Sequence, residues 1–162
     1  MQKALISLGS NLGESLLTIE NALNEIAKLE GVRLLARSAL YQTKPWGFSE
    51  QNDFINALCE IETSLSPLKL LEALQGLEQK FFRVRSENHY GPRTLDLDII
   101  DFQELILDDP KLTLPHPRAK LRAFVLKPLV DLKGDYTFAN GDKALSLLQA
   151  LPSSELEGIK KL

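Results

Sequence analysis

The spacing of apolar residues along positions 1–102 restricts the fold of this chain more than any other feature of its sequence. Two segments, one from about Glu14 to Glu30 and one that opens at Ser66-Pro67, carry apolar residues three or four positions apart, as an amphipathic helix does. Around them lie segments with the apolar and β-branched character of strands, at residues 3–9, 32–43, 54–63 and 94–102. The predicted order is therefore strand, helix, strand, strand, helix, strand.

This element order is that of the ferredoxin-like βαββαβ arrangement. We expect an α+β fold with a mainly antiparallel sheet and both helices on one face. The first helix should end at Gly31 and bury Leu16, Ile19, Leu23, Ile26 and Ala27. The second should bury Leu70, Leu71, Leu74, Leu77 and Phe81, with Ser66 as its N-cap.

The rest of the chain predicts additions to this core. Residues 104–107 can return as a hairpin, and extra C-terminal helices are expected from about Arg118 and after Asp142. The segment beyond Pro152 predicts little. No repeat or linker interrupts the chain, so residues 1–162 are interpreted as a single domain.

Composition excludes several classes of protein. Hydrophobic residues make up 44% and charged residues 25% of the chain, as in soluble globular proteins, and the net charge of −3 predicts no affinity for nucleic acid or an anionic membrane. The lone Cys59 allows no intramolecular disulfide and is typical of a reducing compartment. The apolar run at residues 4–8 is too short for a signal peptide or a membrane span. We expect a cytoplasmic monomer.

The stretch "GPRTLDLDII" (91–100) places two aspartates on one strand. Alternate side chains of a strand point the same way, so Asp96 and Asp98 share one face, with Cα atoms roughly 6.5 Å apart. Two carboxylates at that separation repel each other unless water, a base or a cation lies between them. An isolated D-x-D is more often the solvated face of a half-buried strand, so this pair alone does not decide between a surface and a cation site.

Basic residues flank the aspartate pair in the sequence on both sides. Arg83, Arg85 and Arg93 precede or adjoin it, and the run "HPRAKLRAFVLK" (116–127) follows without an acidic residue. Solvated helix ends are the simpler explanation for such clusters, but arginine binds phosphate oxygens bidentately. Carboxylates for a hard cation beside arginines for anions favour a metal-polyphosphate site, best satisfied by a nucleoside triphosphate with Mg²⁺.

Other catalytic arrangements are missing from the sequence. "GSNLG" (9–13) lacks the Lys-Ser/Thr ending of a P-loop, and no Ser-His-Asp triad suggests itself. Cys59 shares the apolar face of its strand with Ile55, Ala57 and Ile61, which indicates an inert core thiol. Neither histidine has a zinc-type spacing, so His116 is interpreted as a phosphate contact.

The strand at 54–63 carries a different kind of signal. Phe54 and Asn56 stand on one face, and an aromatic ring beside an amide can bind a flat heterocycle with a polar edge. Phe124 can supply the opposite wall. The alternative, a core phenylalanine beside a strand-end asparagine, remains open and is the better one on these residues alone.

Together these motifs resemble those of a known family. "GPRTLDLDII", "LPHPR" downstream, Arg-x-Arg upstream and "GSNLG" near the N-terminus look like the 6-hydroxymethyl-7,8-dihydropterin pyrophosphokinases of folate biosynthesis, over nearly the whole chain and in the same order. The resemblance implies a ferredoxin-like fold and transfer of pyrophosphate from ATP to the pterin hydroxymethyl oxygen, with release of AMP.

The resemblance also implies roles for individual residues. Asp96 and Asp98 would hold two Mg²⁺ ions and, with Arg83 and Arg93, form the catalytic group. The nucleotide side would be lined by Gln75, Glu78, Arg85, Tyr90, Ile99, Lys111, Thr113, His116 and Arg122. The pterin pocket would be formed by Thr43, Pro45, Trp46, Phe54, Asn56 and Phe124. No residue stands out as a general base.

Four of these residues depart from the common family pattern. Trp46 replaces a smaller apolar residue, and Phe54 and Tyr90 stand where Tyr and Trp also occur, all of which keep the apolar character. Lys111 in place of arginine gives up a bidentate contact. Two rival functions remain: a nucleic-acid-binding ferredoxin-like domain, which the negative charge and the missing aromatic RNP pattern disfavour, and a non-catalytic nucleotide or pterin-binding module.

Overall fold

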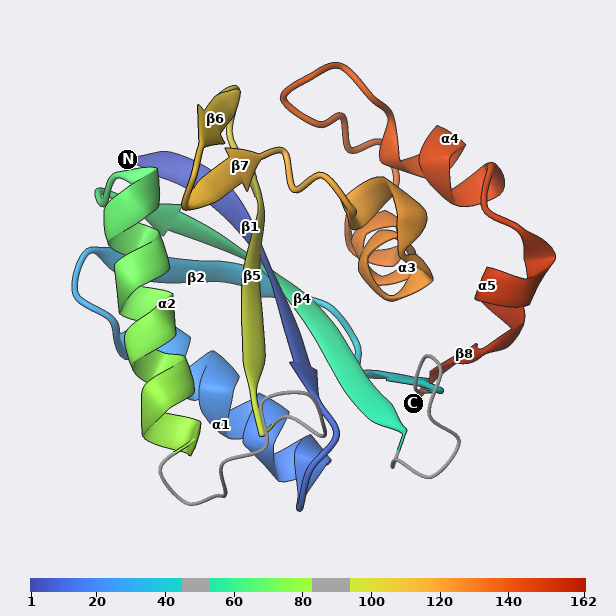
Figure 1. The fold of residues 1–162 in the computed structure, drawn as a ribbon, viewed down its shortest axis with the longest axis horizontal. Coiled ribbons are helices and arrows are strands. Elements are labelled where there is room, and N and C mark those ends of the chain that lie inside the picture. Colours follow the sequence, from blue (N-terminus) through green and yellow to red (C-terminus); the bar gives the residue numbers. More distant parts are fainter. Residues whose placement is uncertain (45–52, 83–93) are drawn as a thin grey trace.

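The fold is that of a computed structural model, in which residues 1–44, 53–82 and 94–162 are described. Its elements along the chain are β1 (Gln2–Ser10), α1 (Ser15–Lys28), β2 (Val32–Arg37), β3 (Tyr41–Thr43), β4 (Phe54–Thr63), α2 (Pro67–Phe82), β5 (Asp96–Phe102), β6 (Leu107–Asp109), β7 (Leu112–Leu114), the 3-10 turn η1 (Ala119–Leu121), α3 (Ala123–Leu132), α4 (Ala144–Gln149), α5 (Ser153–Glu157) and β8 (Ile159–Lys161). The order of the first elements confirms the predicted ferredoxin-like core (Figure 1).

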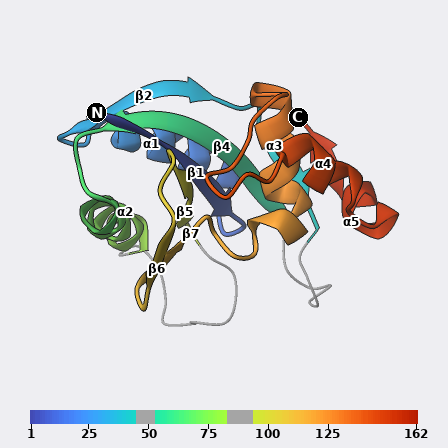
Figure 2. The same cartoon turned by 90° about the horizontal axis from the view of Figure 1, so that it is seen from above.

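The described strands form one main antiparallel sheet in the order β5-β1-β4-β3-β8, and β2 also pairs with β4. α2 lies on one side of β5, and α3 and α4 lie on the other, in both views (Figures 1 and 2). The sheet is therefore covered on both faces, with the two predicted helices on one face and the C-terminal additions on the other.

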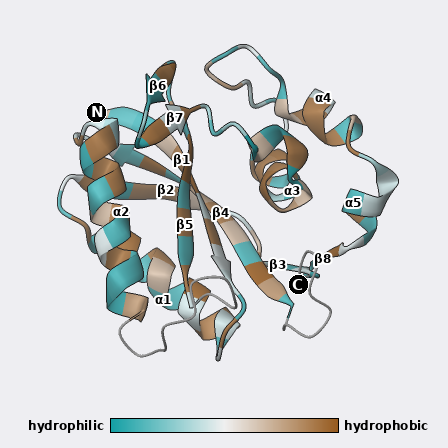
Figure 3. Cartoon of the chain, viewed as in Figure 1, coloured by the Kyte–Doolittle hydropathy of each residue, from teal (hydrophilic) through white to brown (hydrophobic). Residues whose placement is uncertain are grey.

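Strand alternation divides the core into two clusters. Ile6, Leu8 and Ile61 pack with the helices α1 and α2, whereas Leu5 and Leu58 pack with α3 and α4. Neighbouring residues of one strand thus contribute to opposite cores, as the period of two requires. Hydrophobic and hydrophilic bands also alternate along α2, with the longer period of a helix, because only one of its faces meets the sheet (Figure 3).

The helix ends agree with the sequence in part. Ser66 caps α2, since its Oγ accepts the Lys69 N–H at 3.3 Å. α1 ends at Lys28 with Leu29 as its C-cap, earlier than the predicted end at Gly31. Gly31 lies in the turn that follows, with a φ of +79°, a left-handed conformation that favours glycine. The buried stripe of α1, however, is Ile19, Ala22, Leu23 and Ile26.

Leu16 and Ala27 were predicted to be buried in α1 and are exposed. At about 100° per residue, both lie on one flank of the stripe, roughly 60–90° from its centre. Leu70, Leu74 and Leu77 of α2 are buried as expected, and Leu71 and Phe81 pack against the core with part of their surface exposed.

Three other boundaries differ from the prediction. Residues 32–43 form two strands, β2 and β3, because the register against β4 shifts between the pairs Arg37↔Cys59 and Tyr41↔Asn56. Between the two strands, Ser38 bonds the Leu58 backbone through both its N–H and its Oγ. The expected hairpin at 104–107 lies further along, between β6 and β7. The helix expected from Arg118 begins at Ala123, because Arg122 has an extended backbone.

Candidate active site

The aspartate pair lies on the sheet face that also carries α3 and α4. Asp96 and Asp98 are half-buried on β5, and Leu97 and Ile99 between and after them are buried in the opposite core. Both aspartates line a pocket of about 740 Å³ in which residues from β1, β3, β4, α3 and α5 meet. The prediction that they share one face is confirmed.

The central strand β1 supplies the floor between the aspartates and β4. Gly9 pairs with Asp96 on one side and with Asn56 on the other, and Ser7 pairs in the same way with Asp98 and Leu58. A Cβ atom on Gly9 would lie 3.1 Å from the Oδ1 atom of Asn56. Glycine at this position therefore leaves room for the Asn56 amide and keeps the floor flat.

The large pocket is lined by the Asn56 amide and by two aromatic rings. Asn56 is buried and donates from Nδ2 to Thr43 Oγ1 at 2.8 Å, which fixes the orientation of its amide. Phe54 and Phe124 line the same pocket from β4 and α3. The Arg122 guanidinium lies 5.4 Å from the centroid of the Phe124 ring, a cation–π distance.

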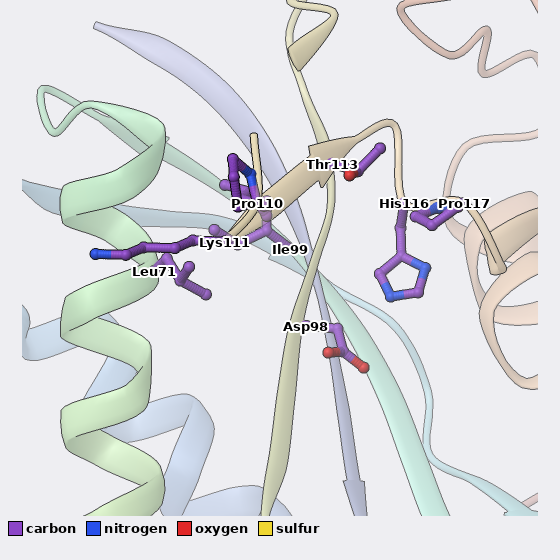
Figure 4. Close-up of a pocket in the computed structure, with 9 residues that line it drawn as sticks. Leu71, Asp98, Ile99, Pro110, Lys111, Thr113, His116 and Pro117 are labelled. Atoms are coloured by element: carbon purple, nitrogen blue, oxygen red, sulfur yellow. The ribbon is translucent and has the colours of Figure 1, made fainter. Parts of the chain in front are cut away.

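A second, smaller pocket of about 220 Å³ lies next to the aspartates. Its lining includes Asp98, Ile99, Lys111, Thr113 and His116. Asp98 and the His116 ring point to the same side of β5, whereas Lys111 extends toward α2 (Figure 4). Asp98 lines both pockets, so a ligand that spans them would pass over this carboxylate.

His116 is oriented by its own loop. Its Nδ1 accepts the Arg118 backbone N–H at 3.1 Å, so in the neutral ring the proton is on Nε2. Burial lowers the pKa of His116, and the nearby charges of Arg122 and Arg118 lower it further. The neutral ring thus presents an N–H donor, the form suited to a hydrogen bond with a phosphate oxygen.

Glu78 brings a further carboxyl group to the aspartates. It reaches from α2 to β5, where one of its oxygens accepts the Leu97 N–H at 2.8 Å. Burial raises the pKa of Glu78 to about 7, and the charges of Asp96 and Asp98 add to this effect. Crowded carboxylates of this kind are relieved by a cation.

The donor set suits a metal bound jointly with phosphate. No group of three or more His, Cys, Asp or Glu residues in the described part of the chain is arranged to hold a metal alone. Mg²⁺ is commonly held by one or two carboxylates, with substrate phosphates and water as its other ligands. Asp96 and Asp98 together meet this requirement.

The structure brings together most of the predicted site residues that it describes. Thr43, Phe54, Asn56, Arg122 and Phe124 share the large pocket with the aspartates, and Ile99, Lys111, Thr113 and His116 line the small one. Gln75 is exposed on α2 and lines neither pocket. Six predicted residues lie outside the described residues: Pro45, Trp46, Arg83, Arg85, Tyr90 and Arg93.

Sequence reasoning missed several residues of the large pocket. Ser7 and Gly9 belong to the strand and turn at the N-terminus, and Arg118 and Leu121 belong to the basic run, so motifs already marked both regions. Ser154, Glu155 and Gly158 also line it, and nothing in the sequence marked them.

Paired carboxylates on a ferredoxin-like sheet, with basic side chains in the same pocket, suit a transferase that acts on a nucleotide. A family model described as 7,8-dihydro-6-hydroxymethylpterin-pyrophosphokinase (HPPK) matches residues 5–134. The chain belongs to this family. It is an ATP-dependent pyrophosphokinase of folate biosynthesis, which confirms the predicted activity over both rival functions.

Curated relatives agree along the whole chain. A 2-amino-4-hydroxy-6-hydroxymethyldihydropteridine pyrophosphokinase of Pseudomonas aeruginosa is 44% identical over 162 residues, covering 100% of this chain and 98% of the relative. One of Methylorubrum extorquens is 37% identical, covering 99% and 100%. A folic acid synthesis protein of Schizosaccharomyces pombe is 39% identical over 93% of this chain, which spans 20% of that protein.

Solved structures confirm the fold. The Plasmodium falciparum HPPK-DHPS with pteroate has a TM-score of 0.71 at 14% identity, over 91% of this chain and 42% of that one. A triple mutant of it with STZ-DHP has a TM-score of 0.76 at 15% identity, over 99% and 45%. This chain thus spans less than half of those longer chains. No helix in the described residues is long and apolar enough to cross a membrane.

Proposed function

We propose that Asp96 and Asp98 hold two Mg²⁺ ions between this chain and the triphosphate of ATP, and that the pterin binds beside them against Asn56. The observation that carries this proposal is the sheet register. Gly9 pairs with both Asp96 and Asn56, so a metal site and a heterocycle site are separated by a single residue without a side chain. A hydroxymethyl group attached to a ring at Asn56 can therefore reach a phosphate held at Asp96.

In the proposed reaction the pterin hydroxymethyl oxygen attacks the β-phosphorus of ATP. The bond between that phosphorus and the oxygen bridging to the α-phosphate breaks, AMP leaves, and the hydroxyl proton is released. Mg²⁺, when bound, neutralises the charge of the phosphates. The chain contributes chiefly by positioning, which supplies most of the rate enhancement in phosphoryl-type transfer.

Each side of the site has a proposed task. The neutral His116 donates from Nε2 to a phosphate oxygen, and Arg122 provides a cation for the phosphates from the rim of the large pocket. Asn56 keeps one N–H and its Oδ1 for the pterin edge after its bond to Thr43. Phe54 and Phe124 stack on the two faces of the ring.

The remaining nucleotide and catalytic assignments are proposals on the same basis. Ile99, Lys111 and Thr113 line the small pocket, and Glu78 reaches the strand that carries the aspartates; all four would line the nucleotide. Gln75, Arg83, Arg85, Tyr90 and Arg93 are proposed for the nucleotide side, and Pro45 and Trp46 for the pterin side, from the sequence alone.

The test is the identity of the nucleotide product. The protein is incubated with ATP, Mg²⁺ and the hydroxymethyl dihydropterin, and nucleotides are separated by chromatography. AMP in equal amount to pterin diphosphate is expected. ADP as the product, or no turnover by folded protein, would contradict the proposal. Omission of Mg²⁺, with a chelator added, should abolish AMP formation and leave the fold unchanged.

We also propose that residues 1–162 form a single domain that acts as a cytoplasmic monomer. Both core clusters use the same sheet, which supports a single domain. Cys59 is buried and free, as suits a reducing compartment. Light scattering after size exclusion should give a mass close to 18.1 kDa; twice that mass would contradict the proposed monomer.

A further inference from the structure

The last ten residues, 153–162, form a C-terminal arm that consists of α5 and β8. They lie beyond the residues 5–134 that the family model matches. Ser154, Glu155 and Gly158 of this arm nevertheless line the same pocket as Asp96, Asn56 and Phe124. The arm is therefore a wall of the candidate active site.

The attachment of the arm to the molecule runs through β3. β8 pairs with β3 in the register Tyr41↔Lys161, Gln42↔Lys160 and Thr43↔Ile159, and the Leu162 N–H donates to the Leu40 carbonyl at 2.9 Å. α5 has no buried residue, so it contributes little to either core. β8 lies beside β3, and the chain ends there (Figure 3).

The strand that the arm holds positions the amide of Asn56. Thr43 is the last residue of β3, and its Oγ1 accepts the hydrogen bond from Asn56 Nδ2. A three-residue strand has few bonds of its own, and β3 lies between β4 and β8. Loss of β8 would make β3 an edge strand. Thr43, which orients the Asn56 amide in the pocket, would then lie on that edge.

We propose that the C-terminal arm is a positioning element of the pterin site: it fixes β3, and through Thr43 the Asn56 amide, and it walls the outer side of the pterin pocket. This inference rests on the assignment of the pterin to that pocket in the proposed function. The arm sets the affinity for the pterin and leaves the nucleotide side, built from β5, β7 and the loop at His116, unaffected.

The test uses two neighbouring lysines of β8. In an antiparallel ladder, hydrogen-bonded pairs alternate with pairs that are not bonded. Because Leu162 bonds Leu40, Lys160 and Gln42 are the next bonded pair. The N–H of Lys161, between Lys160 and Leu162, points away from β3. Lys160→Pro removes a donor to β3, whereas Lys161→Pro makes the same change in residue and charge without that loss. Proline is tolerated where an edge strand's N–H faces solvent.

Calorimetric titrations with the hydroxymethyl dihydropterin, at saturating Mg²⁺ and non-hydrolysable ATP analogue, measure the effect. Lys160→Pro should raise the pterin Kd about fivefold relative to Lys161→Pro. The Kd of the ATP analogue should stay unchanged. In turnover assays the KM for the pterin should rise while kcat at saturating pterin holds. Equal pterin Kd values for the two variants, or an equal loss of affinity for both ligands, would overturn the proposal.

A second pair of variants tests the wall directly and does not disturb β8. Gly158 has a helical φ of −85°, and a Cβ built on it meets no atom within 4 Å, so Gly158→Leu adds bulk at the pocket lining from a position with room for its Cβ. It should weaken pterin binding, whereas Glu157→Leu, at an exposed neighbour outside the pocket lining, should not. Equal pterin affinity for these two variants would contradict the arm as a wall.

Asn56→Ala separates this inference from the proposed function. If Asn56→Ala weakens pterin binding and Lys160→Pro and Lys161→Pro have equal pterin Kd values, only the role of the arm is wrong. If Asn56→Ala leaves the pterin Kd unchanged, the pocket assignment and the role of the arm are both wrong.

Discussion

Asp98 lines both pockets, so the nucleotide and pterin sides that we propose would meet at this residue. Its negative charge adds to that of Asp96 beside Glu78, whose pKa of about 7 reflects burial first and the two aspartates second. We therefore expect the grouping that we propose as a cation site to be unfavourable in the metal-free protein. We expect function and stability to be opposed at this group of carboxylates, as they are at many active sites.

Asp98→Asn should consequently abolish turnover and leave the fold intact. The amide keeps the shape of the carboxylate but loses the charge that holds the metal, while repulsion with Asp96 and Glu78 is relieved. We expect AMP formation to fall to background and the melting temperature without Mg²⁺ to stay or rise. Asp108→Asn, at an exposed carboxylate of β6, is the control and should retain activity. Near wild-type turnover of Asp98→Asn at saturating Mg²⁺ would refute the metal assignment.

Asn56→Ala should weaken pterin binding selectively. Loss of the amide leaves polar groups of the bound ring unpaired, at a cost of about 1–3 kcal/mol, or a roughly 5- to 150-fold higher Kd. Phe54→Ala should also weaken pterin binding, through lost stacking. Affinity for a non-hydrolysable ATP analogue should hold in both variants. An equal loss of ATP-analogue affinity, or a largely unfolded Asn56→Ala protein, would make the residue structural.

His116 should titrate below the ordinary histidine range in the free protein. Burial and then the charges of Arg122 and Arg118 lower its pKa in the folded state. The unfolded chain then binds a proton more readily than the folded protein. The free energy of unfolding therefore decreases as the pH falls below about 6.5, and the decrease due to His116 levels off once the pH is below its folded pKa.

Two measurements check this expectation in Mg²⁺-free buffer. Histidine NMR shifts should give a pKa below about 6.5, and an ATP analogue should raise it because phosphate favours the charged ring. Chemical denaturation should show that His116→Gln loses less stability than wild type between about pH 7 and pH 5. A His116 pKa above the ordinary value would contradict the neutral donor that we propose.

The helices and strands that the sequence predicts well are those that bury one face, because burial gives their apolar residues a regular spacing. β5 was recognised because Leu97 and Ile99 alternate with the aspartates, and α2 because its leucines recur with the helical period. The break between β2 and β3 was missed, because a register shift against β4 leaves no trace in the composition of either strand. β8 was missed for a related reason: it is three residues long, and its partner β3 is remote in sequence.

The candidate site was predicted to a similar extent. Asp96 and Asp98 were predicted because their charge and spacing marked them, and His116 because it lies in the motif "LPHPR". All three line the pockets of the candidate site. Gly9 was missed as a site residue, although "GSNLG" contains it, because its role depends on Asn56 lying opposite it in the neighbouring strand. Cross-strand proximity of this kind is a property of the folded sheet and not of either segment.

The position of Gly9 in β1, beside Asn56 at the floor of the pocket, leads to a further prediction. Gly9→Ala places a Cβ atom 3.1 Å from Asn56 Oδ1, a close contact that the amide must yield to by moving. We expect weaker pterin binding with little change in ATP-analogue affinity. The control is Gly76→Ala on α2, whose Cβ meets no atom within 4 Å. It should leave pterin binding unchanged and stabilise the protein by about 0.5–1 kcal/mol through helix propensity. Unchanged pterin binding in Gly9→Ala would show that the floor tolerates a side chain.

For the whole molecule, the important feature is that two layers of helices share one sheet. The α3–α4 layer is joined to it by polar as well as apolar contacts: Lys133 Nζ donates to Glu60 Oε2 at 2.7 Å, and the Tyr136 hydroxyl donates to the buried Asp101. The large pocket of the candidate site lies on this second face, where residues from the sheet and from α3 meet. Its geometry therefore depends on both layers remaining docked.

We expect the two layers to unfold together, because neighbouring residues of β1 and β4 serve opposite cores. Ile26 of α1 and Leu126 of α3 are both fully buried, one in each cluster. Ile26→Ala and Leu126→Ala should each lower the free energy of unfolding by about 2–5 kcal/mol. Urea denaturation followed by far-UV and near-UV circular dichroism should give one coincident transition for each variant, with the wild-type m-value.

If Leu126→Ala instead produced an early transition confined to one signal, the α3–α4 layer would be a separate unit. The pocket would then open by undocking of that layer, before the sheet itself unfolds.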